Sequence, residues 1–106
     1  FTVGTVKQDA LLFQLGYFNE EEQQLLQRTG AGDICSRFFD SQGNICSPAI
    51  NERTVGIDLP DLRKKEKSIL VAGSQRKIDA IRAALVGKYA NILVTDQFTA
   101  QALLVE

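Results

Sequence analysis

The alternation of apolar and polar positions is most regular between residues 68 and 96. Residues 69–72 form a short unbroken apolar run that is rich in β-formers, and residues 92–94 repeat this pattern. Such runs are typical of strands that are buried on both faces. Between the runs, an i, i+3, i+7 stripe indicates a helix and consists of Ile78, Ile81 and Leu85. The pattern predicts a strand–helix–strand unit with parallel strands.

Polar residues follow the first of these strands, at the edge where such units usually bind ligands. Ser74 is a good N-cap for the helix, and Gly87 is well placed at its C′ position. Helix N–H groups, a serine hydroxyl and Lys77 would suit a phosphate after Gly73. Gly-Ser-x-x-Lys is a weak motif, however, and a capping role for Ser74 with a solvated Lys77 explains the same spacing.

The first thirty residues predict a strand end and two helices. Residues 1–5 resemble the end of a strand, in which Gly4 suggests a close backbone approach. Residues 10–15 are strongly apolar and favour a short helix or turn that is closed by a glycine. Asn19 and Glu22 have capping-box spacing, which predicts a helix that ends at Gly30.

Residues 32–46 have the turn chemistry of a hairpin, with one strand over residues 32–40 and a turn near Gln42-Gly43. In this register Cys35 and Cys46 do not face each other, which favours two free thiols. Asp33 is unusual because a carboxylate in an apolar strand needs a partner. A turn or capping role and a ligand role for Asp33 both remain open.

The remaining stretches predict loops and two short helices. Residues 47–59 read as loop and irregular chain, and a short helix is expected over residues 61–65. A last helix is expected over residues 98–104, capped by Thr95 or Asp96.

Composition excludes several classes of function. The chain has 106 residues, which allows one small domain. Its net charge of −1 argues against nucleic-acid binding by this segment alone. The absence of histidine excludes histidine bases and histidine-ligated metals. There is no apolar run of membrane-spanning length and no signal-peptide pattern. Unpaired cysteines fit a cytoplasmic protein, and the lack of methionine suggests a piece of a longer chain.

Four spaced motifs together resemble a known family. They are GDIC-x-RFFD-x-x-G (residues 32–43), N-x-R-x-VGI (51–57), VAG-x-x-x-K-x-x-AI-x-AAL (71–85) and NILVTD-x-x-x-A-x-x-LL (91–104). In this order they look like the C-terminal portion of the sugar-binding, or effector-binding, domain of the SorC/DeoR-type bacterial transcriptional regulators. The resemblance covers nearly the whole chain.

The resemblance implies an α/β fold, a Rossmann-like parallel sheet with flanking helices that is similar to sugar-phosphate isomerases, here joined to a β-hairpin. Family members bind a phosphorylated sugar or related carbohydrate metabolite and thereby change how an N-terminal helix-turn-helix holds operator DNA. They associate as dimers and tetramers. The expected protein is therefore an allosteric sensor without catalytic residues, a metal or another cofactor.

The resemblance also assigns roles to individual residues. Asp33 matches the acidic residue that contacts effector hydroxyls, with Ile34 and Cys35 lining the pocket beside it. Gly73, Ser74 and Lys77 match the anion-binding turn and its lysine, so these six residues form the expected effector site.

Two departures from the family pattern remain. The family has one more residue before Gly32, and its domain is about twice as long. Residues 1–106 are therefore expected to be a C-terminal portion that holds part of a pocket, without the first half of the domain or the helix-turn-helix.

Two alternatives to a sensor remain open. One is a sugar-phosphate isomerase or deaminase of the same fold, in which Asp33 would act as a base; no second carboxylate is placed to assist it. The other is an oligomerisation segment without a ligand.

Overall fold

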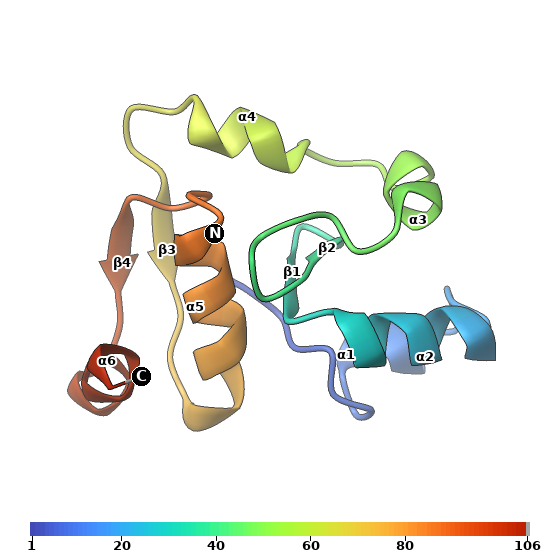
Figure 1. The fold of residues 1–106 in the computed structure, drawn as a ribbon, viewed down its shortest axis with the longest axis horizontal. Helices are drawn as coiled ribbons and strands as arrows, with labels where there is room; N and C mark the ends of the chain where they lie inside the picture. The colour runs from blue at the N-terminus through green and yellow to red at the C-terminus, as the bar shows by residue number, and fades with distance from the viewer. Residues whose placement is uncertain (106) are drawn as a thin grey trace.

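The computed structural model describes residues 1–105, and Figure 1 shows their arrangement. The helices are α1 (Leu11–Gln14), α2 (Glu20–Thr29), α3 (Pro48–Glu52), α4 (Leu59–Arg63), the 3₁₀ helix η1 (Gln75–Lys77), α5 (Ile78–Val86) and α6 (Gln97–Leu104). The strands are β1 (Gly32–Ile34), β2 (Arg37–Phe39), β3 (Ile69–Val71) and β4 (Ile92–Val94). None of these helices is long and apolar enough to cross a membrane.

The predicted strand–helix–strand unit is confirmed as β3–α5–β4. The two strands are parallel, with Leu70 opposite Leu93, and α5 packs beside β3 (Figure 1). Leu70 is fully buried, but Ile69 and Val71 are 42% and 53% exposed. The expectation of strands buried on both faces is thus wrong for residues 1–105, because α5 covers one face and no described element covers the other.

The ends of α5 differ in detail from the sequence prediction. The Ser74 side chain makes no capping hydrogen bond, and the helix begins with the 3₁₀ turn η1. At the other end Gly87 keeps a helical φ of −73°, while Lys88 takes the left-handed conformation with φ +63°. Gly87 is needed for space instead, because a Cβ there would lie 2.8 Å from the Tyr89 ring.

Residues 1–4 join the two sheets. The Val71 N–H donates to the Phe1 carbonyl at 2.9 Å, and Gly4 exchanges backbone hydrogen bonds of 2.9 and 3.2 Å with Asp33. The close approach expected at Gly4 is confirmed, since a Cβ there would lie 2.1 Å from Oδ1 of Asp33. This segment therefore lies between β3 on one side and β1 on the other.

The hairpin contains two turns where the sequence analysis predicted one. Strands β1 and β2 are antiparallel and are joined by Cys35 and Ser36, which have φ angles of +52° and +69°. The prediction of one strand over residues 32–40 is therefore wrong, because these two residues adopt the left-handed conformation of a two-residue turn. The second turn, at Gly43 with φ +84°, is confirmed. Both cysteines are free thiols, as expected, although Cys35 is exposed.

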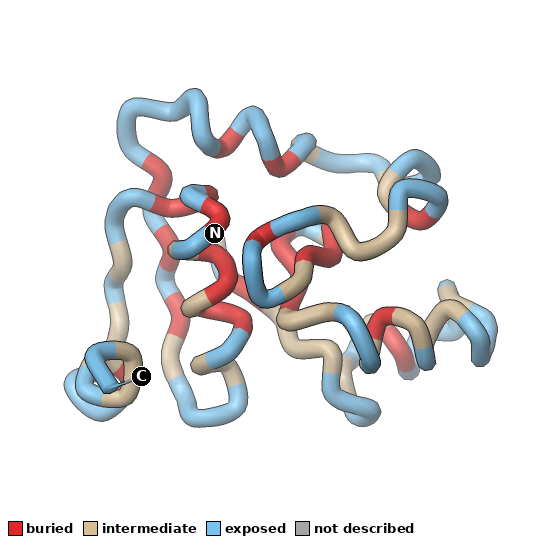
Figure 2. Tube along the Cα trace, viewed as in Figure 1, coloured by how far each residue is buried: buried red, intermediate tan, exposed pale blue. Residues whose placement is uncertain are grey.

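Strand β2 contributes to two hydrophobic clusters, because neighbouring side chains point to opposite faces of a strand. Phe39 packs with α5 and β3 in the larger cluster, while Phe38 packs with Phe13 and Leu26 in the smaller one. Figure 2 shows the buried segments gathered where α5 faces the hairpin and β3. The two clusters fix the hairpin between α5 and the α1–α2 segment.

The chain between the hairpin and β3 is more ordered than predicted. Residues 48–52 form α3 where a loop was expected, because Ser47 caps it and Pro48 occupies its first turn. The next loop closes on the buried Arg37, whose guanidinium donates to the carbonyls of Asn51, Gly56 and Ile57. Arg37 thus connects the hairpin to the residue 51–57 motif through hydrogen bonds.

Candidate functional site

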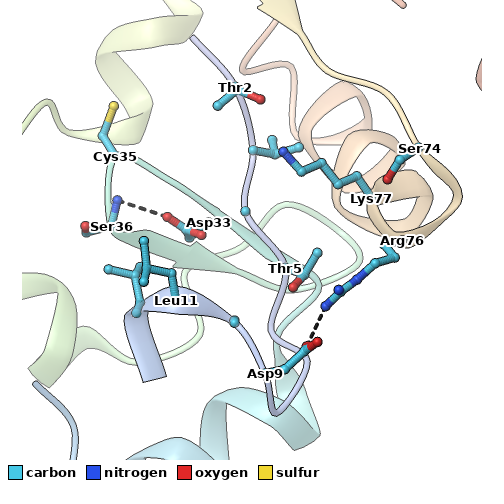
Figure 3. Close-up of a pocket in the computed structure, with 14 residues that line it drawn as sticks. Thr2, Thr5, Asp9, Leu11, Asp33, Cys35, Ser36, Ser74, Arg76 and Lys77 are labelled. Carbon is cyan, nitrogen blue, oxygen red and sulfur yellow. Dashed lines mark hydrogen bonds and ion pairs between the residues drawn. The ribbon is translucent and has the colours of Figure 1, made fainter. Parts of the chain in front are cut away.

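An open cavity of about 560 Å³ lies beside residues 2–5 (Figure 3). Its other walls come from residues 9–12, from the turn that follows β1 and from the turn that follows β3. Its polar side chains include Asp33 and Ser36 on one wall and Ser74, Arg76 and Lys77 on another. This is the largest of the cavities described in residues 1–105.

The backbone pairing of the first four residues brings these distant groups together. Gly4 pairs with Asp33 in β1, while Phe1 pairs with β3, whose chain continues into Ser74 and Lys77. Figure 3 shows Asp33 on one side of residues 2–5 and Lys77 on the other, with the lysine side chain extending toward this segment. A ligand in the cavity could therefore contact a carboxylate on one wall and an ammonium group on the other.

Asp33 is a buried carboxylate with one occupied oxygen. Only 9% of the residue is exposed, and its Oδ2 accepts the Ser36 N–H at 3.1 Å. Its Oδ1 faces Gly4 and receives no hydrogen bond from residues 1–105. Burial raises the pKa of Asp33, while the Ser36 N–H and the charge of Lys77 act in the opposite direction. A ligand hydroxyl could satisfy the remaining oxygen.

The turn after β3 carries two cationic side chains, which differ in whether they form an ion pair. Arg76 forms an ion pair with Asp9, whereas Lys77 forms none with the residues that the structure describes. Ser74 has φ +98° and ψ 150°, a conformation that is normally restricted to glycine. Its N–H donates to Oγ1 of Thr99 at 3.1 Å, and Thr99 is held in turn by Asp96. The hydrogen bond from Ser74 to α6 thus holds the turn in this strained conformation.

Four of the six expected site residues line the cavity, and two do not. Asp33, Cys35, Ser74 and Lys77 lie on its walls. Ile34 is fully buried in the larger cluster, because strand alternation turns its side chain away from that of Asp33. Gly73 is turned toward Asp96, where a Cβ would lie 2.6 Å from Oδ2. Neither residue therefore lies on the wall of the cavity.

Sequence reasoning missed several residues of the cavity. Asp9 and Arg76 were not singled out, and Ser36 was assigned to the interior of a strand. Asp9 and Arg76 are 67 positions apart in the chain, so no local pattern connects them. Gly4 was the one sequence signal for this part of the cavity. It indicated a close backbone approach but did not identify Asp33 as the partner.

Asp33 should make the stability of the protein depend on pH. Its pKa is raised above the ordinary value of 3.8 in the folded chain, so the folded chain holds this proton more tightly than the unfolded chain. The free energy of unfolding therefore falls as the pH rises between the two pKa values. We expect Asp33→Asn to be more stable than the wild type at pH 7, with a difference that shrinks toward pH 3.8.

Urea denaturation of both proteins from pH 4 to 7 measures this difference. Other titrating groups affect both proteins alike and cancel in the comparison. A difference that stays constant with pH would contradict the raised pKa.

Comparisons with known proteins agree with this architecture. A family model described as "Putative sugar-binding domain" matches residues 1–105. The chain is 67% identical over 103 residues to the deoxyribonucleoside regulator of Bacillus subtilis (strain 168), covering 97% of this chain and 33% of that protein. It is 42% identical over 88 residues to the sorbitol operon regulator of Klebsiella pneumoniae, covering 83% of this chain and 28% of that protein.

Solved structures show the same fold. The full-length sorbitol operon regulator SorC from Klebsiella pneumoniae matches with a TM-score of 0.83 and 38% identity, over 97% of this chain and 34% of that one. A transcriptional regulator from Streptococcus pneumoniae TIGR4 matches with a TM-score of 0.89 and 31% identity, over 97% and 40%. The chain spans about a third of the length of the curated relatives it matches. The chain belongs to the sugar-binding domain family of the SorC/DeoR-type transcriptional regulators.

Proposed function

We propose that this chain forms part of the effector site of a transcriptional regulator and that its effector is a phosphorylated sugar. Asp33 would accept hydrogen bonds from sugar hydroxyls, and Lys77 would pair with the phosphate. Ser74 and Cys35 would border the ligand. Ile34 and Gly73 would support these residues from behind.

One observation carries the proposal: in this member of the sugar-binding domain family, two groups without a partner among residues 1–105 line the same cavity, one oxygen of the buried Asp33 carboxylate and the Lys77 ammonium. Hydroxyl groups are natural donors to a buried carboxylate, because they satisfy an acceptor that would otherwise be costly to bury. An ammonium group is a common partner of phosphate. A ligand with both groups, such as a sugar phosphate, would suit both walls of the cavity.

The proposal extends to the whole protein. Residues 1–106 would be the C-terminal portion of the effector domain, and a separate helix-turn-helix would bind operator DNA. The protein would act as a homo-oligomer, a dimer or a tetramer, and would carry out no catalysis. An effector that favours one arrangement of the oligomer would shift the population and change DNA affinity by linkage.

Ligand-induced stabilisation of the intact protein tests the proposal. We would measure Tm with ribose 5-phosphate, 2-deoxyribose 5-phosphate, glucose 6-phosphate and the matching unphosphorylated sugars. A ligand that binds only the folded state stabilises by RT ln(1 + [L]/Kd), about 2.7 kcal/mol at a hundredfold excess over Kd. We expect a sugar phosphate to raise Tm, its unphosphorylated sugar to have little effect, and Asp33→Asn to lose the response.

The alternatives predict different results. Steady conversion of a sugar phosphate by the intact protein would favour an isomerase or deaminase. No stabilisation by any compound of the panel would contradict the proposed site and leave the oligomerisation segment as the better explanation.

A further inference from the structure

We propose that the Asp9–Arg76 ion pair is a latch that the anionic group of the ligand opens. The latch joins residues 7–16, here called the strap, to the turn that follows β3. Both partners line the cavity described above. This inference rests on the proposed function, because it requires an anion to reach the cavity.

The position of the ion pair carries the first part of the argument. An Asp9 carboxylate oxygen contacts Nη2 of Arg76 at 2.5 Å, and Figure 3 shows this contact beside the cavity. No other hydrogen bond or ion pair joins the strap to residues 74–77 in the part of the chain that the structure describes. The ion pair is thus the polar contact through which this turn holds the strap.

The ion pair between Asp9 and Arg76 is also weak. The Arg76 and Asp9 side chains are 53% and 61% exposed. Ion pairs this exposed are weak, since water screens them and both side chains lose freedom. A phosphate offers a guanidinium two parallel hydrogen bonds and more charge than a single carboxylate oxygen. An anion held by Lys77, the neighbouring residue, would therefore compete well for Arg76.

The strap is lightly held by the rest of the chain. Phe13 is its one buried residue and packs in the smaller cluster, against which Ala10 and Leu12 are partly buried, while Leu11 and Leu15 are 67% and 51% exposed. Leu11 and Leu12 also line the cavity. Loss of the Asp9 contact would free residues 7–9, while Ala10, Leu12 and Phe13 keep the rest of the strap anchored. Ligand binding would then change the strap without unfolding the core.

Two substitutions in the intact protein test the latch by moving affinity in opposite directions. Asp9→Asn removes the competitor for Arg76, so we expect about two- to fivefold tighter binding of the sugar phosphate that binds the wild type best. Arg76→Gln removes the cation, so we expect binding to weaken by about tenfold. Lys64→Gln removes an exposed positive charge elsewhere and should leave affinity unchanged. Calorimetric titration measures all four proteins.

Hydrogen exchange gives a second readout. In the wild type the same sugar phosphate should increase exchange of the Ala10 amide, which is the amide of residues 7–12 that donates a hydrogen bond within residues 1–105, to the Lys7 carbonyl. In Asp9→Asn this exchange should already be high without ligand and should not increase further.

The possible failures are distinguishable. Equal affinities of Asp9→Asn and the wild type, or slower exchange of the strap with ligand, would overturn the latch and leave the proposed function intact. Failure of the wild type to bind any sugar phosphate would overturn both.

Discussion

Replacing Arg37 by leucine is expected to lower the free energy of unfolding by about 3 kcal/mol. Arg37 is 5% exposed and donates three hydrogen bonds to carbonyls of residues 51–57, besides an ion pair of 3.2 Å with Asp58. Leucine fills part of the volume but leaves the Gly56 and Ile57 carbonyls without a donor from residues 1–105, while the Asn51 carbonyl keeps the Thr54 N–H. Hydrogen bonds to charged groups contribute about 1.5–3 kcal/mol each, and water would replace some of them.

Urea denaturation of the intact protein measures the effect, with two controls. Arg53→Leu changes an arginine of the residue 51–57 motif whose side chain is 52% exposed and paired with Glu22, so we expect a loss below about 1 kcal/mol. Asp58→Asn should also have a small effect, because Asp58 is 63% exposed and Arg37 keeps its three carbonyls. Equal losses in the two arginine variants would contradict a special role of Arg37.

Lys77→Ala is expected to raise the Kd for a sugar phosphate by about 10- to 100-fold. This range corresponds to the loss of one charge-assisted hydrogen bond, about 1.5–3 kcal/mol. Lys77 is the cation of the cavity that forms no ion pair with residues 1–105, so the folded protein has no internal pair to lose. Its stability without ligand should therefore change little.

Two further variants separate charge from structure. Lys77→Arg keeps the positive charge and should recover part of the affinity, although its planar group is shaped differently. Lys67→Ala removes an exposed lysine outside the cavity and should bind as the wild type does. Normal binding by Lys77→Ala would exclude a phosphate contact at this residue.

Local sequence patterns were sufficient to predict several elements and the family. The capping box of Asn19 and Glu22 is present as predicted, and Asp96 caps α6. The apolar runs of β3 and β4 and the stripe between them were also sufficient to predict their parallel pairing. These features depend on neighbours within a few residues, which a sequence pattern records directly.

Local patterns were less reliable where backbone conformation overrides propensity. Cys35 and Ser36 form a tight turn within an apolar run, and Ser74 adopts a glycine-like conformation because Thr99 holds its N–H. Neither residue type favours a positive φ. A contact with α6 therefore decided the Ser74 turn, whereas the Cys35-Ser36 turn is held by the pairing of β1 with β2 and by the Ser36 N–H that donates to Asp33.

The pairing of distant segments determines which residues share the cavity. Residues 2–5 lie between β1 and the end of β3, so Asp33 and Lys77 line one cavity although 44 positions separate them in the chain. The same arrangement turns Ile34 and Gly73 away and brings in Asp9 and Arg76. The physical reason is that strand pairing fixes which side chains face each other across the fold, and this pairing is set by backbone hydrogen bonds between distant segments.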